Sequence, residues 1–286
     1  MDQKLIDLYD DYVHGGASRR EFLDRLTKLA GSTVAALTLL PLLENNYALA
    51  QTIAETDDRL VTGRVEYDAG GARMSGYLAR PTGGRKHPAV IVIHENRGLN
   101  PHIQDVARRL AVEGFLALAP DMLSPSGGTP PDEAKAIELI GKLDAAETAA
   151  RLTATVPFLA GHAESNGKVG VVGFCWGGGL VNRLAAAGTS LNAAVAYYGM
   201  QIPAADVPKI TAPLLLHYGS LDQRINAGIA DYETALKANK KPYELYIYEG
   251  ANHAFNNDTN AARYNKEAAT LAWGRTLAFF KKYLGG

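Results

Sequence analysis

Three residues of this chain have the types and the order that nucleophilic catalysis requires. Cys175, the chain's only cysteine, lies in the sequence Gly-Phe-Cys-Trp-Gly-Gly just after an apolar run. Asp222 and His253 each lie a few residues past a later apolar run. A thiolate can attack a carbonyl carbon, an imidazole can move the protons, and a carboxylate can orient the imidazole. The sequence therefore predicts a Cys-His-Asp triad of Cys175, His253 and Asp222.

The residues around Cys175 are typical of a nucleophile elbow, a sharp turn from strand into helix that pushes the nucleophile outward. Gly173 and Gly177 flank the turn, where a Cβ would crowd the neighbouring backbone. Taken alone, a cysteine after an apolar strand is more often a small buried hydrophobe than a nucleophile. Asp222 could likewise be a carboxylate that caps a turn, and His253 a loop histidine without a partner. The order nucleophile, acid, histidine, each past the end of a strand, favours the catalytic interpretation.

The rest of the chain predicts the scaffold that positions these residues. Apolar strand-like runs alternate with helix-like segments, as in a mostly parallel sheet of about eight strands flanked by helices. Ligands bind at the carboxyl ends of the strands in such a sheet, so we expect the three residues at one edge. We expect an N-terminal arm at 1–54 and one α/β domain at 55–286, with strands near 61–67, 74–80, 88–94, 115–119, 168–174, 193–198, 212–218 and 243–249, and helices near 101–113, 131–161, 176–187, 226–239 and 261–283.

Further motifs accompany the elbow: Val92-Ile93-His94-Glu95, Ala119-Pro120-Asp121, and Asp222 with His253-Ala254-Phe255. With these motifs the chain, from about 61 to 283, resembles the dienelactone hydrolase (carboxymethylenebutenolidase) family of the α/β-hydrolase superfamily. The resemblance implies an α/β-hydrolase fold, a carboxylic ester hydrolase activity, and an ester or lactone substrate opened through a thioester on Cys175. It also implies a role for Glu95, which matches a glutamate thought to accept the thiol proton.

Glu95 follows an apolar run that is typical of a central strand. A carboxylate at this position could instead pair with Arg97 or cap the helix that starts near Pro101. We favour the catalytic role, because a carboxylate near the thiol can hold its resting proton. For the oxyanion we expect two backbone N–H donors, those of Trp176 and Asn96.

The sequence departs from the family where the family has arginines that hold a substrate carboxylate. Asn257 stands four residues after His253 in place of one, and residues 122–128 contain none. Because a guanidinium is the natural clamp for a carboxylate, we expect a neutral or differently anchored ester or lactone, with Arg97 as a partial substitute. The Pro-, Gly- and Ser-rich segment 124–131 is expected near the pocket mouth.

The N-terminal segment carries a second signal. Residues 18–23, Ser-Arg-Arg-Glu-Phe-Leu, resemble a twin-arginine export signal and precede an uncharged apolar stretch at 29–43. We therefore expect export to the periplasm, although the acidic residues before Ser18 are unusual for such a signal. The alternative is a cytoplasmic protein with a retained helical arm that packs on a partner subunit in a homo-oligomer, because Leu5, Ile6, Leu8, Tyr9 and Val13 recur at helical spacing.

Composition and residue patterns argue against several other classes of function. A net charge of −1 without a basic run argues against nucleic-acid binding. The apolar stretch of the arm is short for a stable membrane span, and the seven histidines form no ligand motif, so we expect no metal and no cofactor. Two alternatives to a hydrolase remain: a non-catalytic ligand-binding protein on the same scaffold, and an acyltransferase that uses the same nucleophile.

Overall fold

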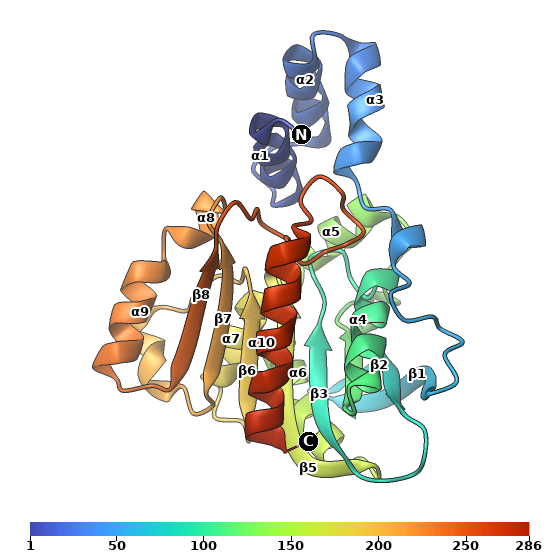
Figure 1. Cartoon of the computed structure of the whole chain (residues 1–286), viewed down its shortest axis with the longest axis vertical. Helices are drawn as coiled ribbons and strands as arrows, with labels where there is room; N and C mark the ends of the chain where they lie inside the picture. The colour runs from blue at the N-terminus through green and yellow to red at the C-terminus, as the bar shows by residue number, and fades with distance from the viewer. Residues whose placement is uncertain (286) are drawn as a thin grey trace.

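The computed structural model describes residues 1–285 and is built around one eight-stranded sheet with helices on both faces (Figure 1). The strand order is β1-β2-β4-β3-β5-β6-β7-β8. The β1–β2 and β2–β4 pairs are antiparallel and all the others are parallel. The predicted α/β-hydrolase sheet is confirmed. Its strands are β1 (Leu60–Ala69), β2 (Ala72–Pro81), β3 (His87–Ile93), β4 (Leu116–Asp121), β5 (Ser165–Phe174), β6 (Ala193–Tyr197), β7 (Leu214–Gly219) and β8 (Tyr243–Tyr248).

The central strands are apolar on both faces because helices cover both. Every residue of β3 is buried, as are those of β4, β6 and β7, which is the pattern of a sheet enclosed between two helical layers. One core layer lies under α4 and α10, and the other lies under α6, α7 and α9. The helices of this domain are α4 (Pro101–Val112), α5 (Glu133–Gly141), α6 (Ala145–Ala160), α7 (Trp176–Ala185), α8 (Gln223–Asn226), α9 (Ile229–Ala238) and α10 (Lys266–Leu284), with short 3-10 turns at Ser124–Ser126 and Ala204–Lys209.

One helix prediction was wrong in detail. We expected a continuous helix over 131–161, but the chain breaks between α5 and α6. Asp144 explains the break, because its side chain accepts hydrogen bonds from the backbone of Ala146 and Glu147, both at 2.9 Å, and so starts a new helix. Helix α5, before the break, forms part of the site described below.

The N-terminal arm, residues 1–54, folds into three helices that stand over the carboxyl edge of the sheet (Figure 1). Tyr9, Phe22 and Leu26 are buried in a small core of its own, which also meets Ile137 of α5. The helical spacing predicted for residues 5–13 is thus present, and the arm packs on the α/β domain of its own chain. Its elements are α1 (Gln3–Val13), α2 (Arg19–Ala30), α3 (Thr33–Leu43) and a 3-10 turn at Tyr47–Leu49.

The segment that resembles an export signal forms the start of α2. Ser18 caps this helix in a reciprocal capping box with Glu21, and the side chains of Arg19 and Arg20 are exposed. Within residues 1–285, no single helix has the length and apolar character needed to cross a membrane. The segments Arg19–Ala30 and Thr33–Leu49 meet those criteria only as a pair bent by 113°.

Candidate active site

The elbow around Cys175 has the predicted geometry. Strand β5 ends one residue before Cys175, and α7 begins one residue after it. Cys175 has φ of 56° and ψ of −116°, a strained conformation for a residue with a side chain, and such strain recurs at nucleophile elbows. A Cβ on Gly177 would lie 2.5 Å from the carbonyl oxygens of Ile93 and His94, so α7 can approach β3 this closely only with glycine at position 177.

The predicted acid and histidine form a buried pair past the ends of β7 and β8. His253 Nδ1 lies 2.6 Å from Asp222 Oδ2. The other carboxylate oxygen of Asp222 accepts a hydrogen bond from the backbone of Ile225 at 3.3 Å, which fixes the carboxyl group at the start of α8. Burial lowers the pKa of His253, but the charges of Asp222, Asp10 and the Cys175 thiolate raise it well above its usual range. A charged imidazole is therefore favoured at this position.

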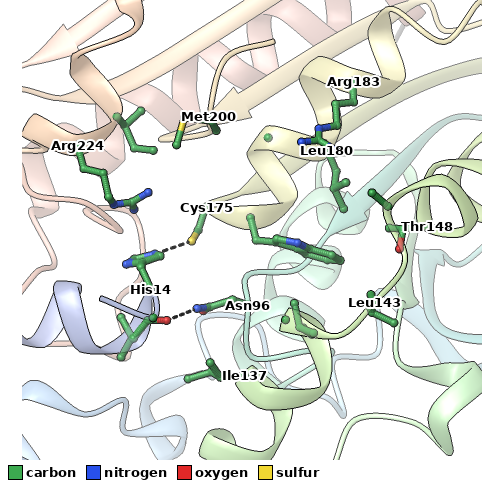
Figure 2. A pocket seen from close by; sticks show the side chains of 18 of the residues that line it. His14, Asn96, Ile137, Leu143, Thr148, Cys175, Leu180, Arg183, Met200 and Arg224 are labelled. Carbon is green, nitrogen blue, oxygen red and sulfur yellow. Dashed lines mark hydrogen bonds between the residues drawn. The ribbon is translucent and has the colours of Figure 1, made fainter. Parts of the chain in front are cut away.

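His14, from the N-terminal arm, is the residue that contacts the thiol most directly. Its Nε2 lies 3.2 Å from Cys175 Sγ, and Figure 2 shows the ring pointing at the sulfur. Its Nδ1 lies 2.8 Å from the carbonyl oxygen of Asp10 and 3.3 Å from that residue's carboxylate. His14 was not among the predicted site residues. The available signal was an aspartate four residues before a histidine at the end of an amphipathic helix, which says nothing about where that helix docks.

The thiol therefore lies between two imidazoles. Ring nitrogens of His14 and His253 and the sulfur of Cys175 all lie within 4.8 Å of one another, and the two rings meet edge to face with centroids 4.8 Å apart. Burial raises the pKa of the Cys175 thiol, but the positive charges of His14 and His253 lower it to about 5. Both imidazoles therefore favour the thiolate form of Cys175. Its charge in turn raises the pKa of His14, which burial alone would lower.

The same three atoms resemble a set of metal ligands, since thiolate and imidazole both bind zinc. However, close approach of a thiol and an imidazole is also what nucleophilic catalysis needs. The arrangement alone therefore does not indicate a metal site.

Glu95 is fully buried and makes other contacts. Its Oε2 accepts a hydrogen bond from Asn257 Nδ2 at 3.0 Å and lies 3.9 Å from Arg97 Nη1. Within residues 1–285, its Oε1 has no hydrogen-bond partner. Burial raises the pKa of Glu95, but Arg97 and the nearby cations lower it below its usual range. The ion pair with Arg97 matches the alternative considered for Glu95, and its role as acceptor of the thiol proton stays a prediction.

Arg97 is buried and its partners hold it away from a substrate. Its guanidinium lies 3.2 Å from Glu133 and 3.3 Å from the hydroxyl of Tyr9, and its side chain is 2% exposed. It does not line the cavity next to Cys175. Arg97 is therefore poorly placed to replace the family's missing arginines.

A cavity of about 540 Å³ opens beside Cys175 (Figure 2). Asn96 and Trp176, the predicted oxyanion donors, both line it. Trp176 is the first residue of α7, where backbone N–H groups have no partner within the helix, and the side chain of Asn96 donates a 2.6 Å hydrogen bond to the carbonyl of Val13. The remaining walls are mostly apolar, with two arginines; they include Ile137, Ile140, Leu143, Leu180, Met200, Arg183 and Arg224.

The expected loop at the pocket mouth lies elsewhere. Residues 124–131 do not line the cavity, and α5 with the turn after it supplies that wall. The carboxylate of Asp121 explains this position, because it accepts two hydrogen bonds from Thr129, each at 2.8 Å, and so folds the loop back on its own strand.

A mostly parallel sheet with a cysteine on an elbow after β5, and an aspartate–histidine pair past the ends of β7 and β8, defines the α/β-hydrolase class. The comparison with known sequences narrows the class. The sequence model described as Dienelactone hydrolase family matches residues 74–284, and the chain belongs to that family.

Relatives of known sequence or structure agree with this assignment. An Escherichia coli O157:H7 protein provisionally named carboxymethylenebutenolidase is 35% identical over 254 residues, which cover 83% of this chain and 93% of the relative. A Bradyrhizobium protein provisionally named 2-oxo-3-(5-oxofuran-2-ylidene)propanoate lactonase is 34% identical, covering 78% and 94%. A crystal structure from Klebsiella pneumoniae, described provisionally as a dienelactone hydrolase, superposes with a TM-score of 0.71 at 33% identity, covering 78% and 99%.

The arm has a match of its own. A sequence model described as YqhI-like matches residues 1–31, which include α1 and α2. That description does not bear on export, and periplasmic location stays a prediction.

Proposed function

We propose that this protein hydrolyses an ester or lactone through a thioester on Cys175. The observation that carries the proposal is the position of the thiol: it lies on an elbow, within 4.8 Å of two imidazole nitrogens, at the wall of a 540 Å³ cavity. The low pKa of Cys175 favours the thiolate, which is the nucleophilic form of the side chain. The family assignment supports the reaction class.

The proposed reaction has two halves. The thiolate attacks the carbonyl carbon, forming a carbon–sulfur bond while the carbonyl electrons move to oxygen, and the backbone N–H groups of Trp176 and Asn96 hold the oxyanion. Collapse re-forms the carbonyl and breaks the carbon–oxygen bond, with a proton from His253 going to the leaving oxygen. A water, deprotonated by His253, then cleaves the thioester and releases the acid and the Cys175 thiolate.

The cavity favours a substrate with an apolar body and a carboxylate. Most of its lining is apolar, and Arg183 and Arg224 bring positive charge to it (Figure 2). Within residues 1–285, Arg183 makes no ion pair, whereas Arg224 lies 3.8 Å from Asp10. Arg183 is thus the better candidate to anchor a substrate carboxylate. The relative named as a propanoate lactonase points to the same class of substrate.

The test is turnover of three substrate groups: neutral esters, neutral lactones and carboxylate-bearing enol lactones. We expect the wild type to hydrolyse the carboxylate-bearing lactones best and Cys175→Ala to hydrolyse none. A pure Cys175→Ala protein that keeps its activity would refute the nucleophile. Added alcohols or amines separate hydrolysis from acyl transfer, because transfer yields new esters or amides instead of the free acid. Thiol labelling without turnover on any substrate would indicate a binding protein.

A further inference from the structure

The N-terminal arm is fixed against the active site by polar contacts from its first and last helices. Asn96 donates a 2.6 Å hydrogen bond to the carbonyl of Val13, at the end of α1. Asn260 donates another, also at 2.6 Å, to the carbonyl of Leu43 at the end of α3. The backbone of Asn46 donates to the carbonyl of Thr259 at 2.7 Å. These contacts hold the arm over the sheet edge, with His14 beside Cys175 and His253.

At that position the arm reproduces the acid–imidazole pair of the α/β domain. Asp10 stands behind His14 as Asp222 stands behind His253, and both imidazoles lie close to the same sulfur. The Asp10 carboxylate is farther from its ring, at 3.3 Å against 2.6 Å for Asp222, and the Asp10 carbonyl oxygen is the closer acceptor at 2.8 Å. Arg263 holds the Asp10 carboxylate at 3.4 Å. Burial raises the pKa of Asp10, but the charges of His253, His14 and Arg263 lower it far below its usual range. An ionised carboxylate behind an imidazole keeps that imidazole oriented and stabilises its charged form.

The docked arm leaves room for a substrate. Val13, His14 and Gly15 form one wall of the 540 Å³ cavity that contains Cys175. His253 and Asp222 line a second cavity of about 350 Å³, and His14 contributes to the walls of both cavities. A segment that merely blocked the site would fill the space beside the thiol, whereas the arm shapes it.

We propose that His14 is a catalytic residue of this enzyme, the imidazole that holds the proton of the Cys175 thiol, and that Asp10 is its positioning residue. The proposal rests on the proposed thioester reaction. The proton moves from Sγ to His14 Nε2, which gives a thiolate–imidazolium pair, and the electron pair left on sulfur forms the bond to the carbonyl carbon. His14 keeps this proton through both halves of the reaction, and His253 handles the protons of the leaving oxygen and of water.

Glu95 is the competing proton acceptor, and geometry favours His14. His14 Nε2 is 3.2 Å from the sulfur, whereas the hydrogen bond of Glu95 goes to Asn257. Cleavage near residue 50 would remove His14, and the cleaved protein would lack this proton acceptor.

The test measures the ionisation of the thiol directly. The rate at which iodoacetamide alkylates Cys175, followed by intact mass from pH 4 to 10, reports the fraction of thiolate. The His14→Gln variant removes only one charged group near Cys175. The other charged groups around the Cys175–His14 pair are kept: Asp10, Glu95, Asp222, Arg224, His253 and Arg263. We expect His14→Gln to raise the midpoint by at least one pH unit, since one of two cations is lost, and to lower kcat/KM by roughly 10²-fold to 10⁴-fold.

Three further variants separate a catalytic role of His14 from a structural one. Asp10→Asn should move the midpoint in the same direction by a smaller amount, while Asp24→Asn, which changes an exposed aspartate on α2, should leave it unchanged. Added imidazole should restore part of the activity of His14→Ala, because the space left by the His14 ring borders the open cavity. A merely structural role for His14 predicts no such rescue.

Two results would overturn the proposal. An unchanged alkylation midpoint in His14→Gln would show that another group holds the proton. Higher turnover in His14→Gln would show that the arm restrains the enzyme. The outcome is separable from that of the proposed function, because the alkylation profile reports the Cys175–His14 pair even if no ester is hydrolysed.

Discussion

Replacement of Asp222 by asparagine isolates the charge behind His253. Asparagine has nearly the same size and can still accept the hydrogen bond from Ile225 that starts α8, so the fold should be kept. The carboxylate oxygen lies 2.6 Å from Nδ1, with charge centres about 4 Å apart. At an effective dielectric constant of about 20, that pair contributes about 4 kcal/mol to the charged imidazole. Because 1.4 kcal/mol is a factor of ten, kcat should fall by roughly 10³-fold.

Steady-state kinetics on the best lactone of the panel measures this effect. We expect the loss in kcat, with a small change in KM, because Asp222 acts through His253 and does not line the cavity beside Cys175. Asp231→Asn, an exposed aspartate in the first turn of α9, is the matched control and should retain wild-type rates. A kcat for Asp222→Asn within fivefold of the wild type would refute the role of the Asp222–His253 pair.

Other predictions concern the elbow, the arm and the cavity. Gly177→Ala should lower the free energy of unfolding by about 1–3 kcal/mol or more, because its Cβ would meet the backbone at the end of β3. The control is Gly274→Ala in α10, where the added Cβ has open space and should leave stability unchanged or raise it. Equal melting temperatures for the two variants would contradict this account. Phe22→Ala removes a fully buried ring from the core of the arm and should lower the stability of the folded arm by about 3–5 kcal/mol. Amide hydrogen exchange should then accelerate in residues 1–50 with β3 still protected, and uniform loss of protection would refute an arm that opens independently. Arg183→Gln should raise the KM for a carboxylate-bearing lactone roughly fivefold, which corresponds to the loss of about 1 kcal/mol from an exposed ion pair. The KM for a neutral ester should stay unchanged. An equal change in KM for the two substrates would exclude Arg183 as the anchor.

The sheet and the elbow could be predicted because their signals are local. Each buried strand is a short apolar run, and Gly173 and Gly177 mark a turn that only small residues permit. The Asp222–His253 pair could be predicted because parallel strands bring their carboxyl ends to one edge.

His14 could not be predicted in the same way. Its contact with Cys175 joins residues 161 positions apart, and helical spacing in residues 5–13 indicates an apolar face without saying what covers it. The docking depends on groups scattered along the chain, such as Asn96 and Asn260, whose polar side chains carry no recognisable pattern. The break between α5 and α6 was missed for a smaller reason, since one capping side chain, Asp144, decided it.

The central claim is that the reaction passes through a thioester on Cys175. Rapid acid quench of the enzyme with a slowly hydrolysed lactone, followed by intact-mass and peptide mass spectrometry, tests it most directly. The mass should rise by that of the ring-opened acyl group, the label should map to the peptide that contains Cys175, and it should be lost on treatment with hydroxylamine. Turnover of the same lactone with no adduct in the quenched wild type, or an adduct that persists in Cys175→Ala, would contradict the mechanism.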